Sequence, residues 1–118
     1  MVLNMKVIYI SGKYRDSRGE YYVAQNILAA EFAAIQVWKM GGVAICPHKN
    51  TSFLGGVCPD ETWLKGDLEL VKRSDAIWMI GNWEESSGAR EELSEAKRQG
   101  KVELYSMIDV AEYLGGYK

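Results

Sequence analysis

The chain has 118 residues, enough for one domain with a hydrophobic core and too few for two. Its formal net charge of -2 gives no electrostatic reason to expect a nucleic acid or an acidic membrane surface as partner. No apolar run approaches the ~18 residues of a membrane span, and we expect residues 1–6 to lead into a strand with no secretory leader. Cys46 and Cys58 lack metal-ligand spacing, so we expect free thiols in a cytoplasmic protein.

The first part of the chain predicts a strand, a long helix and a second strand. Residues 6–10 are rich in β-formers and end at Ser11-Gly12, a helix is expected over 20–40, and a strand over 43–46. The helix carries two apolar stripes, one of Val23, Ile27, Ala30, Ala34 and Val37, the other of Leu28, Phe32 and Ile35. Two stripes predict cover on two sides: the sheet on one, and either a partner subunit or another part of the chain on the other.

The second part begins with an irregular loop over 48–60, of a length that is typical of functional or mobile segments. The remaining elements alternate, with strands expected at 76–80 and 102–105 and helices at 61–73, 87–98 and 108–114. This alternation predicts the α/β class: one domain over residues 1–118, a three-layer sandwich with a four- or five-stranded parallel sheet of the Rossmann or flavodoxin type.

In such sheets ligands bind beyond the carboxyl ends of the strands, here residues 11–15, 47–51 and 81–88. The first loop consists of Ser11, Gly12, Lys13, Tyr14 and Arg15. Its glycine permits close backbone approach, and its two cations suit a phosphate or a polar sugar. The spacing is not that of a P-loop.

The other two loops offer further binding candidates. His48 and Asn50 lie in the second loop, and the lack of another histidine or of clustered cysteines argues against a metal site. In the third loop, Ser86, Ser87 and Gly88 open a helix, which makes an anion site or a plain serine N-cap, two roles that are compatible. Trp83 is placed either to stack on a base or to cover the core; the other tryptophans are expected in the core or an interface.

Two carboxylates interrupt apolar helix faces. Glu92 lies within the stripe of Ala89, Leu93 and Ala96, and Asp67 lies within a stripe of the preceding helix. Burying a carboxylate on an inward helix face costs free energy, so its presence there suggests a function or a buried partner. Paired carboxylates suit glycosyl chemistry, in which one attacks the anomeric carbon and the other manages protons or binds substrate. The alternative is that each caps a loop or pairs with a basic residue.

These residues together resemble the nucleoside 2-deoxyribosyltransferase superfamily, and more closely a branch of small bacterial and phage proteins. The likeness covers nearly the whole chain and rests on four segments: Tyr9-Ile10-Ser11-Gly12, Gly66-Asp67-Leu68, Ser74-Asp75-Ala76, and a Trp-x-x-Ser-x-Gly-Ala-x-x-Glu signature from Trp83 to Glu92. The last of these is the most specific.

The resemblance implies roles for individual residues. Glu92 matches the nucleophile that forms a glycosyl-enzyme intermediate, Asp67 the acid that assists or positions the leaving base, and Tyr9 the tyrosine that contacts the nucleophile. Gly12, Ser86 and Gly88 match groups near the sugar or its 5'-phosphate. Ser86 replaces an aspartate of many transferases, as in related nucleotide hydrolases, which favours a nucleotide. The 47–60 loop is not typical of the transferases, so the base cannot be inferred.

Two functions follow as hypotheses. The first is cleavage of a nucleoside or nucleotide N-glycosidic bond, or deoxyribosyl transfer, through Glu92. The second is a binding protein on the same fold that holds a nucleotide or a nucleotide-derived ligand without turnover, because fold does not fix function. A purely structural role would be favoured by an exposed apolar patch on the 20–40 helix. No cofactor is expected, and relatives that complete their site across subunits imply a homo-oligomer.

Overall fold

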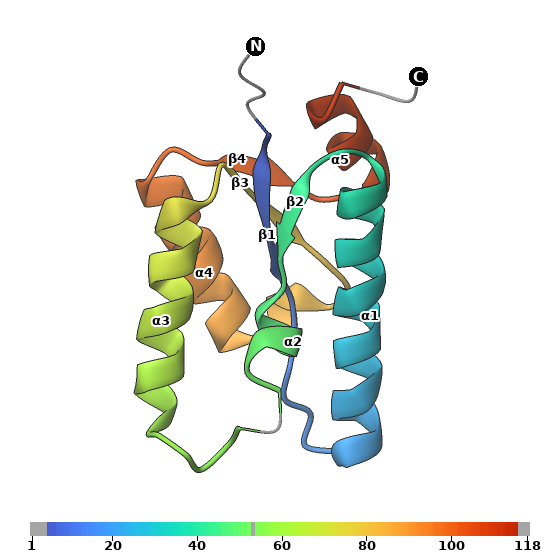
Figure 1. Cartoon of the computed structure of the whole chain (residues 1–118). Coiled ribbons are helices and arrows are strands. Elements are labelled where there is room, and N and C mark those ends of the chain that lie inside the picture. The colour runs from blue at the N-terminus through green and yellow to red at the C-terminus, as the bar shows by residue number, and fades with distance from the viewer. Residues whose placement is uncertain (1–4, 53, 116–118) are drawn as a thin grey trace.

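A computed structural model describes residues 5–52 and 54–115 of the chain. Residues 1–4, part of the segment expected to lack a secretory leader, lie outside these ranges. Four parallel strands form one sheet in the order β2-β1-β3-β4 (Figure 1): β1 is Val7–Ser11, β2 Val43–Ile45, β3 Ala76–Met79 and β4 Val102–Leu104. The α/β class is therefore confirmed, with the four-stranded version of the expected sheet.

Helices cover both faces of this sheet (Figure 1). On one face lie α1 (Glu20–Lys39) and α5 (Met107–Tyr113), and on the other α3 (Asp60–Arg73) and α4 (Ser87–Arg98). Successive side chains of a strand point to opposite faces. Ile8 and Ile10 of β1 accordingly pack in the core under α1 and α5, whereas Tyr9 packs in the core under α3 and α4. This alternation places Tyr9 and Ser11 on the side of the sheet that α4 covers.

The first stripe of α1 faces the sheet as expected, with Ile27, Ala30 and Val37 buried. The second stripe does not find an intrachain neighbour among the described residues, since Phe32 keeps 59% of its surface exposed and Leu28 and Ile35 are exposed as well. The expectation of intrachain cover is therefore wrong for the part of the chain that the structure describes. Cover by a partner subunit stays a prediction.

The expected loop over 48–60 differs from the structure at its start. Pro47–Asn50 forms a short helix, α2, because proline at the first helical position has its backbone angle already set for a helix. A 3-10 turn, η1 (Trp83–Glu85), precedes α4. The other expected boundaries hold to within one or two residues, the usual uncertainty of element ends. Among the described residues, none of the helices combines the length and the apolar character that a membrane crossing needs.

Candidate active site

The carboxylate of Glu92 is held by two hydroxyl groups from β1. Tyr9 donates a hydrogen bond from its hydroxyl to Oε2 of Glu92 at 2.8 Å, and Ser11 donates from Oγ to Oε1 at 2.7 Å. The two donors are two residues apart on a strand, so both side chains reach the face that α4 covers. Glu92 keeps only 8% of its surface exposed. The fold thus brings together the carboxylate of α4 and two hydroxyls of β1, although they lie 83 and 81 residues apart in the sequence.

The basic residues near Glu92 in the sequence have other partners. Arg90 donates to the backbone carbonyl of Glu84, and Lys97 pairs with Glu103 at 3.1 Å between Nζ and Oε1. Glu92 is therefore bound by neutral hydroxyl donors and not by the basic residue that the alternative interpretation required. Neutral donors stabilise the ionised carboxylate less than an arginine or lysine would, so the pKa of Glu92 stays sensitive to burial.

Burial controls the ionisation of the site. Burial raises the pKa of Glu92 to about 7, although the hydrogen bonds from Ser11 and Tyr9 oppose this rise and the charge of Asp67 adds to it. Burial also raises the pKa of Asp67 to about 6. Burial, and next the charge of Glu92, raise the pKa of Tyr9 well above its usual value, so its hydroxyl remains a donor near neutral pH. Two acids that titrate close to neutrality are typical of catalytic sites.

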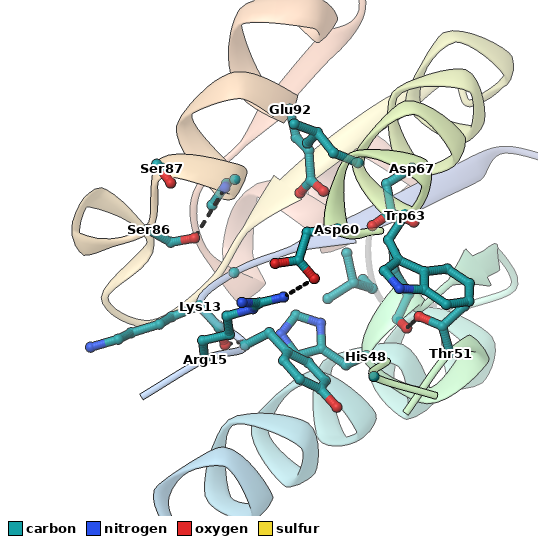
Figure 2. Close-up of a pocket in the computed structure, with 18 of the residues that line it drawn as sticks. Lys13, Arg15, His48, Thr51, Asp60, Trp63, Asp67, Ser86, Ser87 and Glu92 are labelled. Atoms are coloured by element: carbon teal, nitrogen blue, oxygen red, sulfur yellow. Dashed lines mark hydrogen bonds and ion pairs between the residues drawn. The ribbon is translucent and has the colours of Figure 1, made fainter. Parts of the chain in front are cut away.

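A cavity of about 610 Å³ lies beyond the carboxyl ends of the strands, and Glu92 and Asp67 both face it (Figure 2). Its lining comes from the β1–α1 loop, α2, α3 and the start of α4. The residues selected from the sequence that line it are Gly12, Lys13, Tyr14, Arg15, His48, Asp67, Ser86, Ser87, Gly88 and Glu92. Tyr9 and Ser11 contact Glu92 without lining the cavity themselves. Most of the selected residues therefore converge on one place.

Two selected residues lie elsewhere. Trp83 packs against the core under α3 and α4, and its ring centroid is 6.2 Å from that of Tyr105. Asn50 is exposed at the end of α2 and does not line the cavity. The expectation that Trp83 stacks on a base at this cavity is therefore not supported by its position. The interpretation in which it covers the core describes it better.

The tryptophan that does line the cavity is Trp63 of α3 (Figure 2). Trp63 stands four residues before Asp67, so both lie on the same helix face. This spacing could have predicted the position of Trp63, because a residue four positions from Asp67 lies on the same helix face and therefore faces the same cavity. Other lining residues that the sequence did not single out include Thr51, Asp60, Glu61 and Glu85.

The two cations of the first loop are already paired with acids. The Nζ atom of Lys13 lies 2.9 Å from Oε1 of Glu85 and 3.6 Å from Oδ2 of Asp16. The Nη2 atom of Arg15 lies 2.7 Å from Oδ1 of Asp60, which joins the β1–α1 loop to the start of α3 (Figure 2). Neither cation is a free phosphate ligand in this arrangement.

His48 is a buried, neutral part of the cavity wall. Its Nε2 atom lies 3.0 Å from the backbone carbonyl of Lys13, which can only accept, so Nε2 carries the proton. Burial lowers the pKa of His48, and the ring of Tyr14 packs 5.6 Å from it between centroids. No group of three or more potential His, Cys, Asp or Glu ligands for a metal occurs among the described residues.

The two glycines of the site have different reasons to be glycine. A Cβ on Gly12 would lie 2.6 Å from Cγ1 of Ile80 and 3.2 Å from its carbonyl oxygen, so this position is required by close packing against the end of β3. A Cβ on Gly88 would find only Oγ of Ser86, at 3.8 Å. Ser86 caps α4 by accepting a hydrogen bond from the amide of Ala89 at 3.1 Å. Ser86 is therefore the N-cap of α4, and anion binding at this turn stays a prediction.

Fold and site together define an α/β protein of the flavodoxin-like type with a buried, hydroxyl-bound glutamate at the edge of a cavity. The family described as "Domain of unknown function (DUF4406)" matches residues 5–105, so the chain belongs to that family. Comparison with curated protein sequences gives no match.

Among solved structures, the chain is similar to a 2-deoxyribosyltransferase from the psychrotolerant bacterium Bacillus psychrosaccharolyticus. The two share 20% sequence identity with a TM-score of 0.60, over 82% of this chain and 69% of the other. This likeness shows a common fold. The Trp-x-x-Ser-x-Gly-Ala-x-x-Glu signature remains a prediction.

Proposed function

We propose that this protein cleaves the N-glycosidic bond of a nucleoside or nucleotide, or transfers its ribosyl or deoxyribosyl group, through a covalent intermediate on Glu92. The observation that carries the proposal is the Glu92 carboxylate itself: buried, bound by the hydroxyls of Tyr9 and Ser11, and facing a cavity that it shares with Asp67. A structural carboxylate has no need of an adjacent cavity with a second acid of raised pKa.

In the first step, an ionised oxygen of Glu92 attacks C1' of the sugar. A C1'–O bond forms while the C1'–N bond breaks, and its electron pair leaves with the base. A neutral base must gain a proton as it departs, and Asp67 in its protonated form is the group placed to give it. The pKa of about 6 makes proton donation by Asp67 feasible near neutral pH.

In the second step, water or another base attacks C1' while the C1'–O bond to Glu92 breaks, and the attacking group gives its proton to ionised Asp67. Hydrolysis and transfer therefore share the first step and differ only in the acceptor. The hydroxyls of Tyr9 and Ser11 stabilise the carboxylate as it leaves, since both donate to its oxygens. The similarity in fold to a 2-deoxyribosyltransferase supports this chemistry without fixing the acceptor.

The test is base release from a panel of nucleosides, deoxynucleosides and their 5'-monophosphates, with and without a second free base, followed by chromatography. Glu92→Gln keeps the shape of the side chain and removes its nucleophilic charge, so turnover should fall by at least about 10³-fold. Glu112→Gln, which changes an exposed acid on α5 on the other side of the sheet, is the control and should leave turnover unchanged.

A 2'-fluoro analogue that slows breakdown of the intermediate gives a direct second readout. The intact mass of the protein should increase by one sugar, the added mass should map to the peptide with Glu92, and Glu92→Gln should abolish it. Turnover that survives in Glu92→Gln would refute the proposed nucleophile. Absence of base release from every substrate, with thermal stabilisation by one of them, would instead support the binding-protein alternative.

A further inference from the structure

The cavity carries an excess of negative charge. Two cations line it, Lys13 and Arg15, against five carboxylates: Asp60, Glu61, Asp67, Glu85 and Glu92. With Asp67 and Glu92 both protonated, three carboxylates still face two cations. His48 adds no positive charge, because burial lowers its pKa and its buried Nδ1 atom has no hydrogen-bond partner among the described residues to receive a second proton. A pocket lined mainly by one sign of charge concentrates ligands of the opposite sign.

The 5'-phosphate of a nucleotide bound in the cavity would be repelled by the carboxylates that pair with Lys13 and Arg15. Lys13 is bound by Glu85 and Arg15 by Asp60, at 2.9 and 2.7 Å. Exposed ion pairs of this kind are weak, so a phosphate could break them. The released carboxylates would nevertheless stay on the cavity wall beside the phosphate. At the start of α4, the Ala89 amide is already occupied by its serine cap.

The cavity also offers aromatic surface to a flat ring. Trp63 and Tyr14 both line it, and Tyr14 packs on His48. Aromatic faces attract cations through their quadrupole, and carboxylates near them strengthen this preference. The same wall accepts a neutral base by stacking.

We infer that, given the proposed function, this cavity selects N-glycosides that lack a 5'-phosphate and prefers those whose base carries a positive charge. Such substrates also suit the chemistry of the site. When Glu92 attacks C1' of a cationic N-glycoside, the electron pair of the C1'–N bond returns to the ring nitrogen and the base departs neutral. No proton is needed, and Asp67 can remain ionised and stabilise the cation in the bound substrate.

Equilibrium binding tests this inference with two matched sets of probes. The first is the 1-ribosylnicotinamide cation, its uncharged 1,4-dihydro form and its 5'-monophosphate; the second is thymidine and thymidine 5'-monophosphate. We expect each phosphate to weaken binding by about tenfold or more, which is the effect of about 1.4 kcal/mol. We expect the cationic ring to bind several-fold tighter than the dihydro ring, with the preference shrinking as salt increases.

Titrations on Glu92→Gln separate this inference from the proposed function, because they require no turnover. An inactive protein that still ranks the probes in this order would refute the chemistry and leave the charge selection standing. An active protein that binds either monophosphate more tightly than its nucleoside would refute the charge selection alone. Failure to bind any of the five probes at millimolar concentration also counts against it.

Substitutions of two acids that line the cavity, Asp60 and Glu61, provide a second test of the inference. Asp60→Asn should release Arg15 and increase affinity for thymidine 5'-monophosphate several-fold, and Glu61→Gln should reduce the preference for the cationic ring. Glu112→Gln is the matched control, because Glu112 is an exposed acid on α5, on the other side of the sheet. An unchanged or lower affinity for thymidine 5'-monophosphate in Asp60→Asn would overturn the inference.

Discussion

The hydroxyl of Tyr9 donates a hydrogen bond to Oε2 of Glu92 at 2.8 Å, across 83 residues of sequence. This contact joins the first strand to α4 and affects the pKa of Glu92. Burial disfavours the ionised carboxylate, while the donors Tyr9 and Ser11 favour it. Glu92 is consequently held at a pKa of about 7, where a small change in its partners alters the fraction that can act as a nucleophile.

Replacing Tyr9 by Phe should raise the pKa of Glu92 further, since one of its two hydroxyl donors is lost. We expect maximal turnover to fall by about tenfold for each unit of that rise. Loss of the buried hydrogen bond should also cost about 1–3 kcal/mol in the free energy of unfolding. Turnover across pH and denaturant unfolding measure the two effects. Tyr21→Phe, at an exposed position of α1, is the control, and an unchanged pH profile in Tyr9→Phe would contradict the assigned contact.

The pH dependence of turnover should reveal how Asp67 acts. With a neutral base, the active form requires ionised Glu92 and protonated Asp67, so a bell-shaped profile with apparent pKa values near 6 and 7 is expected. With a cationic base no proton donor is needed, and turnover should rise through about pH 7 and then stay level. Identical profiles for both substrate types would rule out Asp67 as the proton donor. Asp67→Asn should remove the alkaline limb.

Stability should also depend on Glu92. Its folded-state pKa of about 7 lies above the unfolded value of ~4.3, so between these limits the folded state holds a proton that the unfolded state has lost. The stability contributed by this proton is complete below about pH 4 and is lost as the pH rises through 7. Denaturant unfolding should show that Glu92→Gln gains on the order of 2 kcal/mol relative to the native protein between pH 5 and 8. A parallel pH dependence in the two proteins would contradict the raised pKa; Glu112→Gln, at an exposed position of α5, is the control.

The fold could be predicted largely from sequence because each element carries a local signal. Apolar runs of four or five residues, such as Ala76 to Met79, predict strands buried on both faces, and the stripe of α1 identifies the face on the sheet. The short helix α2 was not predicted, since four residues that begin with Pro47 carry no periodicity. The sequence also carries no sign that this segment packs against α1, as it does in the structure.

The sequence predicted the two carboxylates of the site, but it did not predict the ion pairs that the cations of the first loop form. Glu92 and Asp67 stand out because they interrupt apolar stripes, which is a property of the sequence alone. That Asp60 binds Arg15 and that Glu85 binds Lys13 depends on how loops 45 and 72 residues apart meet in space, and no pattern in the sequence indicates it. Two cations that favoured a phosphate in the sequence therefore belong to ion pairs in the structure.

The glycines of the site should respond in opposite ways to alanine. Gly12→Ala places a methyl group 2.6 Å from Ile80, and such overpacking costs about 1–3 kcal/mol. Gly88→Ala meets open space in the first turn of α4 and should gain up to about 1 kcal/mol from helix propensity. Thermal unfolding of both variants measures these effects. If Gly88 also lets a ligand approach α4, Gly88→Ala should bind the ligand more weakly despite its greater stability. Equal stability changes in the two variants would contradict the packing around Gly12.

Trp63 and Trp83 have different roles: the sequence indicated Trp83 as the candidate for stacking on a base, whereas the structure places Trp63 at the cavity. Trp63 lines the cavity on the helix face of Asp67, so Trp63→Ala should weaken ligand binding by about tenfold or more, with Trp63→Phe restoring much of it. Trp83 packs on the core near Tyr105, so Trp83→Ala should lower stability and leave the affinity of the folded protein nearly unchanged. Trp38→Ala, at an exposed position of α1, controls for loss of an indole ring. Affinity lost in Trp83→Ala and kept in Trp63→Ala would restore the stacking role to Trp83, and the ligand would then have to reach beyond this cavity.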